Sequence, residues 1–433
     1  MAGSSGTLQD YSVFSPQFIT KVINDIVVDP QTFGVIDKWI PSRDQEPRLG
    51  DEIKWDIHVT HGGMTQPAHE DATSPLIGGM GARQMKWTPP HFREKKVLGG
   101  TDIRNMRKLG TLNDMRTLGE EVAKHIQVLR SRIDNRIYWL KWEAVQNAAA
   151  FNIRGNNITV PLDYSDYGYH GNVGVFWDVG GATIIDDIIG FISQFRQSAC
   201  IPTDAFFGTQ VLQALLADAT LATLVQGQVQ RRVAPDGIYS PMVGQAGIIT
   251  FLQELFGNVA FHYYPFGPVV TLTTINPIGA GAGVTYAVEG DLSLWAVGDV
   301  ATCTYPNGTQ VAVTIQAAGI DLVNNAITLN AGAVAIPMGS QILKRMEFLH
   351  YDQFVMFSEM PPGQMGGQVQ SEFVTVSNFH GEGGIPNMQS GIVGRTINKE
   401  KDDPPSVEMI ASFSGGVVVY HPEGCWLSYK VLT

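Results

Sequence analysis

Between Thr111 and Ala150, apolar side chains recur every three or four residues, and no proline interrupts the stretch. This spacing places them on one stripe of an α-helix. At 1.5 Å per residue the predicted helix is about 55 to 60 Å long, whereas a compact chain of this length has a radius of gyration of about 22 Å. We therefore expect one helix to cross the whole molecule, although an ordinary long helix buried in one large domain has the same pattern. The stripe comprises Met115, Leu118, Val122, Ile126, Leu129, Ile133, Ile137, Leu140 and Ala144.

The C-terminal end of this helix is apolar on more than one side, because Tyr138, Trp139 and Trp142 lie outside the stripe. A helix that is apolar all round needs cover on both sides, so we expect part of that cover to come from elsewhere. Arg132 and Arg136 are one turn apart on nearly the same side. They are placed to hold a carboxylate or the backbone of an adjacent chain, and a solvated basic face is the alternative.

From Gly50 the period changes to two: Ile53, Trp55, Ile57 and Val59 alternate with polar residues, as in a half-exposed strand. A span rich in glycine and proline follows, and then a second strand-like piece at 83–98, which contains Trp87 and Phe92. Two strands joined by a long tip of small residues predict a projecting hairpin. Such a hairpin has little core of its own, so we expect it to lie on a neighbouring subunit.

Beyond the long helix, three helical patterns at 182–199, 210–225 and 246–257 alternate with strand-like runs at 204–209 and 258–265. This alternation predicts one mixed sheet flanked by helices. From Gly267 to about residue 345 charged residues are scarce, and short β-type runs are separated by Gly, Asn and Pro. That spacing favours a small β-barrel or sandwich, inserted between strands of the preceding domain.

The charge and cysteine content exclude some classes of protein. The formal net charge of −12 argues against a general nucleic-acid binder, but it suits a container that leaves nucleic acid free to slide. Three widely spaced cysteines, Cys200, Cys303 and Cys425, fit free thiols in a reducing compartment. No apolar run approaches the ~18 residues of a membrane span, and the N-terminus lacks the pattern of a signal peptide, so we expect neither a membrane association nor a secretory route.

Enzymatic signatures are missing: the chain has no P-loop, no nucleophile elbow and no H-E-x-x-H or C-x-x-C motif. The best candidate for chemistry is the group His58, His61 and His69. His58 and His61 are three apart on a strand and turn, so they point in poorly matched directions for one metal ion. We therefore expect no catalytic, metal or cofactor site, and keep a soluble metal-dependent hydrolase that uses these histidines as an alternative of another class.

Three motifs carry a family resemblance: residues 87–94 (WTPPHFRE), residues 130–140 (RSRIDNRIYWL) and residues 402–405 (DDPP). In this order, the chain resembles the major capsid proteins of tailed bacteriophages, which share the Hong Kong 97 fold. It is most similar to the branch of the lambda major capsid protein and its thermophilic-phage relatives.

The resemblance implies an α+β, Hong Kong 97-like capsid fold with an inserted small all-β domain. The expected parts are an N-terminal arm at 1–45 and an extended loop, the hairpin, at 46–100. The spine helix with the peripheral domain takes 101–180, and the first part of the axial domain takes 181–266. The inserted β-domain spans 267–345, and closing strands of the axial and peripheral domains span 346–433.

The function that the resemblance implies is self-assembly as pentamers and hexamers into an icosahedral head that encloses double-stranded DNA. The expected partners are further copies of the chain, with a scaffolding protein, a portal and a cement or decoration protein beside them, and the DNA is held without sequence-specific binding. The location is the virion, after assembly in the host cytoplasm. An encapsulin-type compartment shell is the nearest alternative, and a tail or portal structural protein is a further one. The residues expected at inter-subunit contacts are Trp55, Trp87, Phe92, Arg132, Arg136, Tyr138, Trp139 and Trp142.

Overall fold

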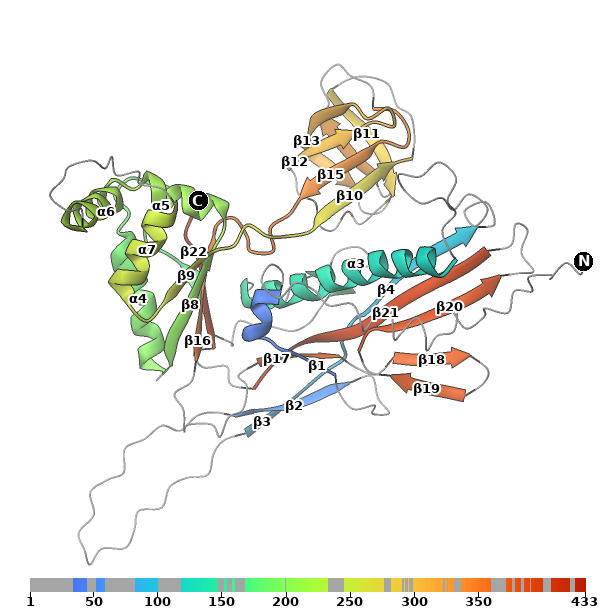
Figure 1. Ribbon diagram of the computed structural model, residues 1–433, viewed down its shortest axis with the longest axis horizontal. Coiled ribbons are helices and arrows are strands. Elements are labelled where there is room, and N and C mark those ends of the chain that lie inside the picture. Colours follow the sequence, from blue (N-terminus) through green and yellow to red (C-terminus); the bar gives the residue numbers. More distant parts are fainter. Residues whose placement is uncertain are drawn as a thin grey trace, which may run out of the picture. The chain divides into compact units, whose positions relative to one another are not determined.

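The structure, a computed structural model, describes most of the chain between residues 34 and 433. It divides into two compact units, residues 1–144 with 360–425 and residues 145–359 with 426–433, and each is described by itself (Figure 1). Helices and strands occur in both, so the α+β class is confirmed. In the described part of the chain, no helix has the length and apolarity to cross a membrane. The described ranges are 34–44, 52–58, 82–99, 118–146, 152–153, 158–159, 168–198, 200–232, 245–275, 282–289, 292, 295, 299–321, 324, 326–330, 336–359, 371–375, 378–382, 385–389, 391–399, 406–420 and 425–433.

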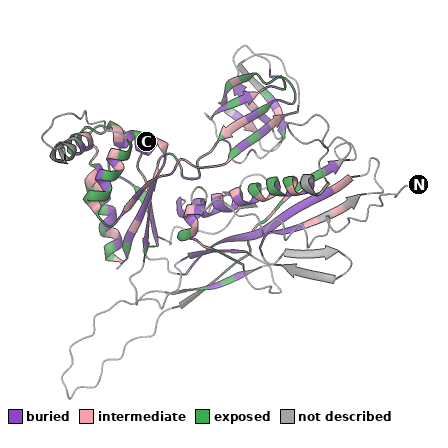
Figure 2. Ribbon diagram, in the orientation of Figure 1, coloured by how far each residue is buried: buried purple, intermediate pink, exposed green. Residues whose placement is uncertain are grey.

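The first unit combines a long helix with a five-stranded sheet. Helix α3 runs from Leu118 to Gln146, about 44 Å at 1.5 Å per residue, and the predicted flanks at 111–117 and 147–150 lie outside the described residues. The sheet has the order β1-β17-β21-β20, with β4 also paired to β21. Strand β21 is buried along most of its length (Figure 2). The bounds are β1 Ser42–Asp44, β4 His91–Gly99, β17 Ser371–Thr375, β20 Val393–Lys399 and β21 Ser406–Val419. A short helix, η2, spans Gly34–Lys38, and β18 Asn378–Glu382 pairs with β19 Ile385–Gln389.

The predicted hairpin forms from β2, Ile53–His58, and β3, Ala82–Trp87. The second strand is shorter than expected, because the chain leaves the hairpin at Thr88 and continues after Pro90 as β4, which pairs with β21. Two consecutive prolines lack the N–H groups that a ladder needs and hold the backbone extended. The expectation of one strand at 83–98 is therefore wrong. The hairpin tip and the N-terminal arm up to residue 33 lie outside the residues that the structure describes.

The base of the hairpin packs on β21 through Trp87. A Cβ atom added to Gly416 would come within 2.2 Å of the Trp87 ring. We expect Gly416→Ala to destabilise the subunit by about 1–3 kcal/mol, because the ring or the strand must move. Urea denaturation of the unassembled subunit measures this. Gly190→Ala is the control, since no atom lies within 4 Å of its added Cβ and alanine favours the helix that contains it. Equal stability of wild type and Gly416→Ala would show that the contact is loose.

The second unit contains a five-stranded mixed sheet of order β7-β22-β16-β8-β9. Helix α4 packs against it, since Phe191 lies 4.6 Å from Tyr429 of β22 between ring centroids. The strands are β7 Tyr169–Asn172, β8 Ile201–Phe207, β9 Ala260–Tyr263, β16 Gln353–Glu359 and β22 Trp426–Lys430, and the helices are α4 Ile184–Gln197, α5 Thr209–Ala217, α6 Ala219–Arg232 and α7 Gln245–Phe256. Strands β5, Asn152–Ile153, and β6, Ile158–Thr159, form a separate pair.

One helix predicted at 210–225 is in fact two. The backbone of Asp218 is extended, at φ −69° and ψ 117°, which ends α5. Its carboxylate then accepts a hydrogen bond from the backbone N–H of Leu221 at 2.6 Å and so caps α6. The periodicity continues across the break, so the sequence alone favoured one helix.

Between β9 and β16 the chain forms a closed six-stranded barrel of order β10-β11-β14-β13-β12-β15. Alternate residues of its strands face an apolar interior that contains Leu272, Tyr286, Cys303 and Ile342, and burial raises the pKa of Cys303 to about 11. Val269 and Arg345, at the two ends of the barrel segment, are partners in the ladder. The insert therefore enters and leaves through neighbouring strands. Its bounds are β10 Val269–Thr274, β11 Ala282–Glu289, β12 Val300–Thr304, β13 Gln310–Asp321, β14 Ala326–Asn330 and β15 Gln341–Arg345.

Candidate inter-subunit surface

All eight residues expected at inter-subunit contacts lie in the first unit, on α3, β2, β3 and β4. Four of them, Trp55, Trp87, Tyr138 and Trp142, are buried by the chain itself. The Trp55 indole donates a hydrogen bond to the backbone oxygen of Val419 at 3.1 Å. These four side chains therefore support the subunit's own packing, and a contact with another copy stays a prediction for them.

Residues 34–44 supply cover for the aromatic end of α3. The Tyr138 hydroxyl donates a hydrogen bond to Asp37 of η2 at 3.1 Å. Lys141, whose side chain is 0% exposed, forms an ion pair with Asp37 and donates to the Ser42 hydroxyl at 2.9 Å. The Lys141 ammonium also lies 5.5 Å from the centre of the Phe373 ring on β17. The segment 34–44, α3 and the sheet are thus joined around one buried cation.

A second ion pair lies beside the first. Asp134 accepts a hydrogen bond from Arg130 Nε at 2.7 Å, one helical turn away. A cavity of about 330 Å³ is lined by both acids, Asp37 and Asp134, together with Arg130 and Tyr138. Burial raises the pKa of Asp134 despite the attraction of Arg130, and it lowers the pKa of Lys141 despite the attraction of Asp37. For Tyr138, burial and the neighbouring Asp37 raise the pKa of the hydroxyl. Desolvation is therefore the dominant electrostatic effect in this cluster.

The raised pKa of Asp134 predicts a pH dependence of stability. A carboxyl whose pKa is higher in the folded state binds its proton more tightly there, so the folded state is favoured at acid pH and loses that advantage as the pH rises through the folded pKa. Asparagine mimics the protonated form of Asp134. We therefore expect the stability of Asp134→Asn not to show this decrease as the pH rises. The check is urea denaturation of wild type and variant at a series of pH values from 4 upwards. Parallel pH profiles for the two proteins would contradict the assignment.

The other four residues form a partly open layer beside the helix. Phe92 of β4 stacks on Phe413 of β21, with ring centroids 4.9 Å apart. The Arg136 guanidinium lies 5.7 Å from the Phe92 ring and 5.1 Å from the Trp139 ring. Arg132 pairs with Glu94 of β4 at 3.2 Å while 59% of its side chain stays exposed. Arg132 and Arg136 do lie on one side of α3, as predicted, and both reach the β4 strand. We call Phe92, Arg132, Arg136 and Trp139 the α3–β4 layer.

Sequence reasoning missed Asp37, Lys141 and Phe413. Lys141 had a signal, because it is a charged residue inside the apolar end of the helix, between Leu140 and Trp142. Its partner Asp37 is 104 residues away in sequence, so periodicity could not find it.

The structure does not describe the side chains of the three candidate histidines. His61, His69 and the side chain of His58 lie outside the described residues. Among the residues that are described, no cluster of His, Cys, Asp or Glu has the arrangement of a metal site. The side chains of Cys200, Cys303 and Cys425 are all buried.

Comparison with known proteins assigns the class. Residues 51–265 match the family described as "Phage major capsid protein E", and no curated protein matches the chain. The matched region includes the hairpin, α3, the α4–α7 helices and strands β7 to β9. The protein is a phage major capsid protein, a structural subunit of a phage head. Residues 51–265, just under half of the chain, carry the similarity to the phage major capsid protein E family.

Several solved structures align with most of the chain. A protein assigned as the capsid protein of a prophage of E. coli CFT073 is 12% identical, with a TM-score of 0.45 over 96% of this chain and 99% of that chain. The capsid of Myoviridae phage XM1 is 8% identical, with a TM-score of 0.41 over 94% and 95%. The capsid of Ralstonia phage GP4 is 8% identical, with a TM-score of 0.39 over 90% and 86%.

Proposed function

We propose that this subunit assembles as hexamers and pentamers into an icosahedral head that encloses double-stranded DNA. The match of residues 51–265 to a major capsid protein family carries the proposal. The net charge of −12 supports it, because an acidic wall repels phosphate and leaves the packaged DNA free to slide. No catalytic step is needed, so the role is structural and not enzymatic. Assembly would take place in the host cytoplasm, with a scaffolding protein, a portal and a cement protein as further partners.

The proposal also assigns a role to each segment of the chain. The arm at 1–45 and the hairpin at 46–100 would lie on adjoining subunits, the spine helix with its strands (101–180) would form the peripheral domain, and 181–266 would belong to the axial domain. The barrel (267–345) would be a surface projection or a brace, and 346–433 would close both domains. The buried ion pair of Asp37 and Lys141 holds residues 34–44 on the subunit's own α3, so the contact with an adjoining subunit is proposed for the residues of the arm that precede them.

The α3–β4 layer is the part of the expected contact set that another subunit can reach. Arg132, with 59% of its side chain exposed, can add a second carboxylate or backbone oxygen to its pairing with Glu94. Arg136, already above two aromatic rings, gives a partner a planar cation to stack on. Arg132→Glu should therefore impair shell formation. Arg345→Glu, on an exposed position of the barrel, is the matched control that should assemble.

The content of native particles tests the proposed role. Purified particles treated with nuclease should retain protected double-stranded DNA, released only when the shell is opened. Protein cargo in place of DNA would instead identify an encapsulin-type compartment, and rings or tubes would identify a tail or portal component. A soluble subunit with hydrolase activity that is lost when His58, His61 and His69 are all replaced by alanine would also overturn the proposal.

A further inference from the structure

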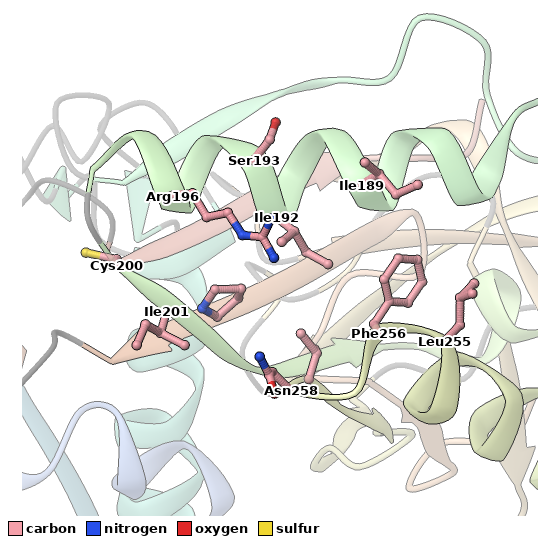
Figure 3. A pocket seen from close by; sticks show the side chains of 11 residues that line it. Ile189, Ile192, Ser193, Arg196, Cys200, Ile201, Leu255, Phe256 and Asn258 are labelled. Carbon is pink, nitrogen blue, oxygen red and sulfur yellow. The ribbon is translucent and has the colours of Figure 1, made fainter.

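The second unit has an apolar groove between α4 and α7. Its cavity is about 390 Å³ and is also lined by residues 200–202, at the start of β8. Ile192 and Arg196 extend from α4, and Phe256 extends from α7 toward the same space (Figure 3). The floor is buried, since Cys200 and Val259 are no more than 3% exposed. The groove is therefore a formed depression and not a gap in the packing of the core.

The rim of this groove exposes large aliphatic side chains. Ile189 is 51% exposed, Ile201 is 47% exposed and Leu255 is 46% exposed, and each comes from a different element. Single exposed aliphatic residues are ordinary, but a cluster around one hollow is typical of a contact surface. Arg196 is the one charged residue among those described as lining it. The groove thus fits a partner surface that is apolar with a negative charge.

A second hollow of the same unit has the complementary chemistry. It is about 760 Å³ and its charged lining residues are both acidic, Asp178 and Asp218. Val179, 46% exposed, adds an apolar side chain. The Asp178 carboxylate accepts hydrogen bonds from the backbone N–H and hydroxyl of Thr433, and these lower its pKa and keep it charged.

The groove and the hollow lie at different places along α4. The groove uses residues 189–196 of that helix and the start of β8, whereas the hollow uses residues 180–182, just before the helix, and α5, which follows β8. The nearest lining residues on this segment, Ala182 and Ile189, are seven residues apart, about 10 Å of helix rise. Because the two surfaces differ and complement each other, a contact between copies is heterologous, and a heterologous contact closes into a ring when the rotation allows it.

We propose that the α4–α7 groove of one copy receives the exposed rim of the Asp178/Asp218 hollow of the next copy, which carries Asp178 and Val179, in a head-to-tail ring. Ile189, Ile201 and Leu255 lose their exposure to water in that contact, and Arg196 meets the acidic side chains. The proposal rests on the self-assembly proposed above and names the surfaces that the ring uses. Val300, an exposed residue of the barrel, lines neither surface and so provides a position outside the proposed contact.

The test begins with Ile189→Asp and its matched control Val300→Asp. Both replace an exposed aliphatic residue by a charge, so neither should unfold the subunit, which circular dichroism and urea denaturation verify. Ile189→Asp should raise the protein concentration needed for assembly at least about tenfold, the loss expected of a residue central to an interface. Val300→Asp should assemble as wild type does. Normal assembly of Ile189→Asp would overturn the proposal.

A charge exchange tests the identity of the partner surface. Arg196→Glu should weaken assembly by repulsion from the acidic hollow, and Asp178→Lys combined with it should restore assembly. Failure of the double variant to recover, while each single variant folds, would overturn the assignment of the hollow as partner. If the wild-type chain itself forms no particles, the proposed function fails as a whole. If wild type and both groove variants assemble equally, this inference alone fails.

Discussion

Replacing Asp37 by alanine is expected to destabilise the first unit by about 3 kcal/mol, because it leaves a buried ammonium without its counter-charge. Lys141 has no exposed side-chain surface, and its remaining hydrogen-bond partner would be the Ser42 hydroxyl. The hydrogen bond from the Tyr138 hydroxyl to Asp37 is lost in the same variant. Since Asp37 is in η2, residues 34–44 should also detach from α3 more readily.

Replacing the other partner of the ion pair, Lys141, should lower the free energy of unfolding by less. Lys141→Met replaces the buried cation by an apolar side chain of similar length, and the Asp37 carboxylate that it leaves behind is 38% exposed and can be hydrated. Urea denaturation of the unassembled subunit gives both free energies, and limited proteolysis reports detachment of 34–44. If Lys141→Met were more destabilising than Asp37→Ala, the cluster would not be dominated by the burial of the cation.

The second large effect is expected at Phe354, in the middle strand of the α/β sheet. Its ring is fully buried and lies 5.4 Å from Trp177, 5.9 Å from Phe191 and 6.4 Å from Phe207 between centroids. Phe354→Ala should destabilise the second unit by about 3–5 kcal/mol, through lost burial and the cavity left behind.

A matched control is Tyr351, in the turn just before β16, the strand that contains Phe354. Tyr351 is 52% exposed, so Tyr351→Ala should change the free energy of unfolding by no more than about 0.5 kcal/mol. Urea denaturation followed by tryptophan fluorescence is suitable, because Trp177 contacts Phe354. A loss below about 1 kcal/mol for Phe354→Ala would mean that neighbouring rings fill the space, and the aromatic core would then be far less rigid than the packing indicates.

Periodicity in the sequence predicts the elements well where a single face is buried. The stripe of α3 is an example, since Ile126, Leu129 and Ile133 are all buried. The insert is another, because its alternating positions, such as Leu272 and Cys303, face the barrel interior. The sequence did not decide whether the strands of the insert close into a barrel or form a sandwich. Strand β15 closes the barrel because it pairs with both β10 and β12. These strands are far apart in sequence, so no local pattern predicts the pairing.

Predicting the candidate contacts was harder, because an apolar side chain looks the same whether its own chain or another copy covers it. Trp87 is covered by β21 at Gly416, and Trp55 by the end of the same strand. Tyr138 is covered from η2. The two arginines gave a clearer signal, since side chains one helical turn apart must share a side of the helix. The groove between α4 and α7 could not be predicted, because it depends on where three separate elements meet.

The central claim is that copies of this chain close into a shell. Electron microscopy of the purified protein, with sedimentation velocity on the same sample, tests it most directly. We expect closed, isometric particles with a hexamer and pentamer lattice and little free subunit. A single species that sediments as a folded monomer at high protein concentration would contradict the account.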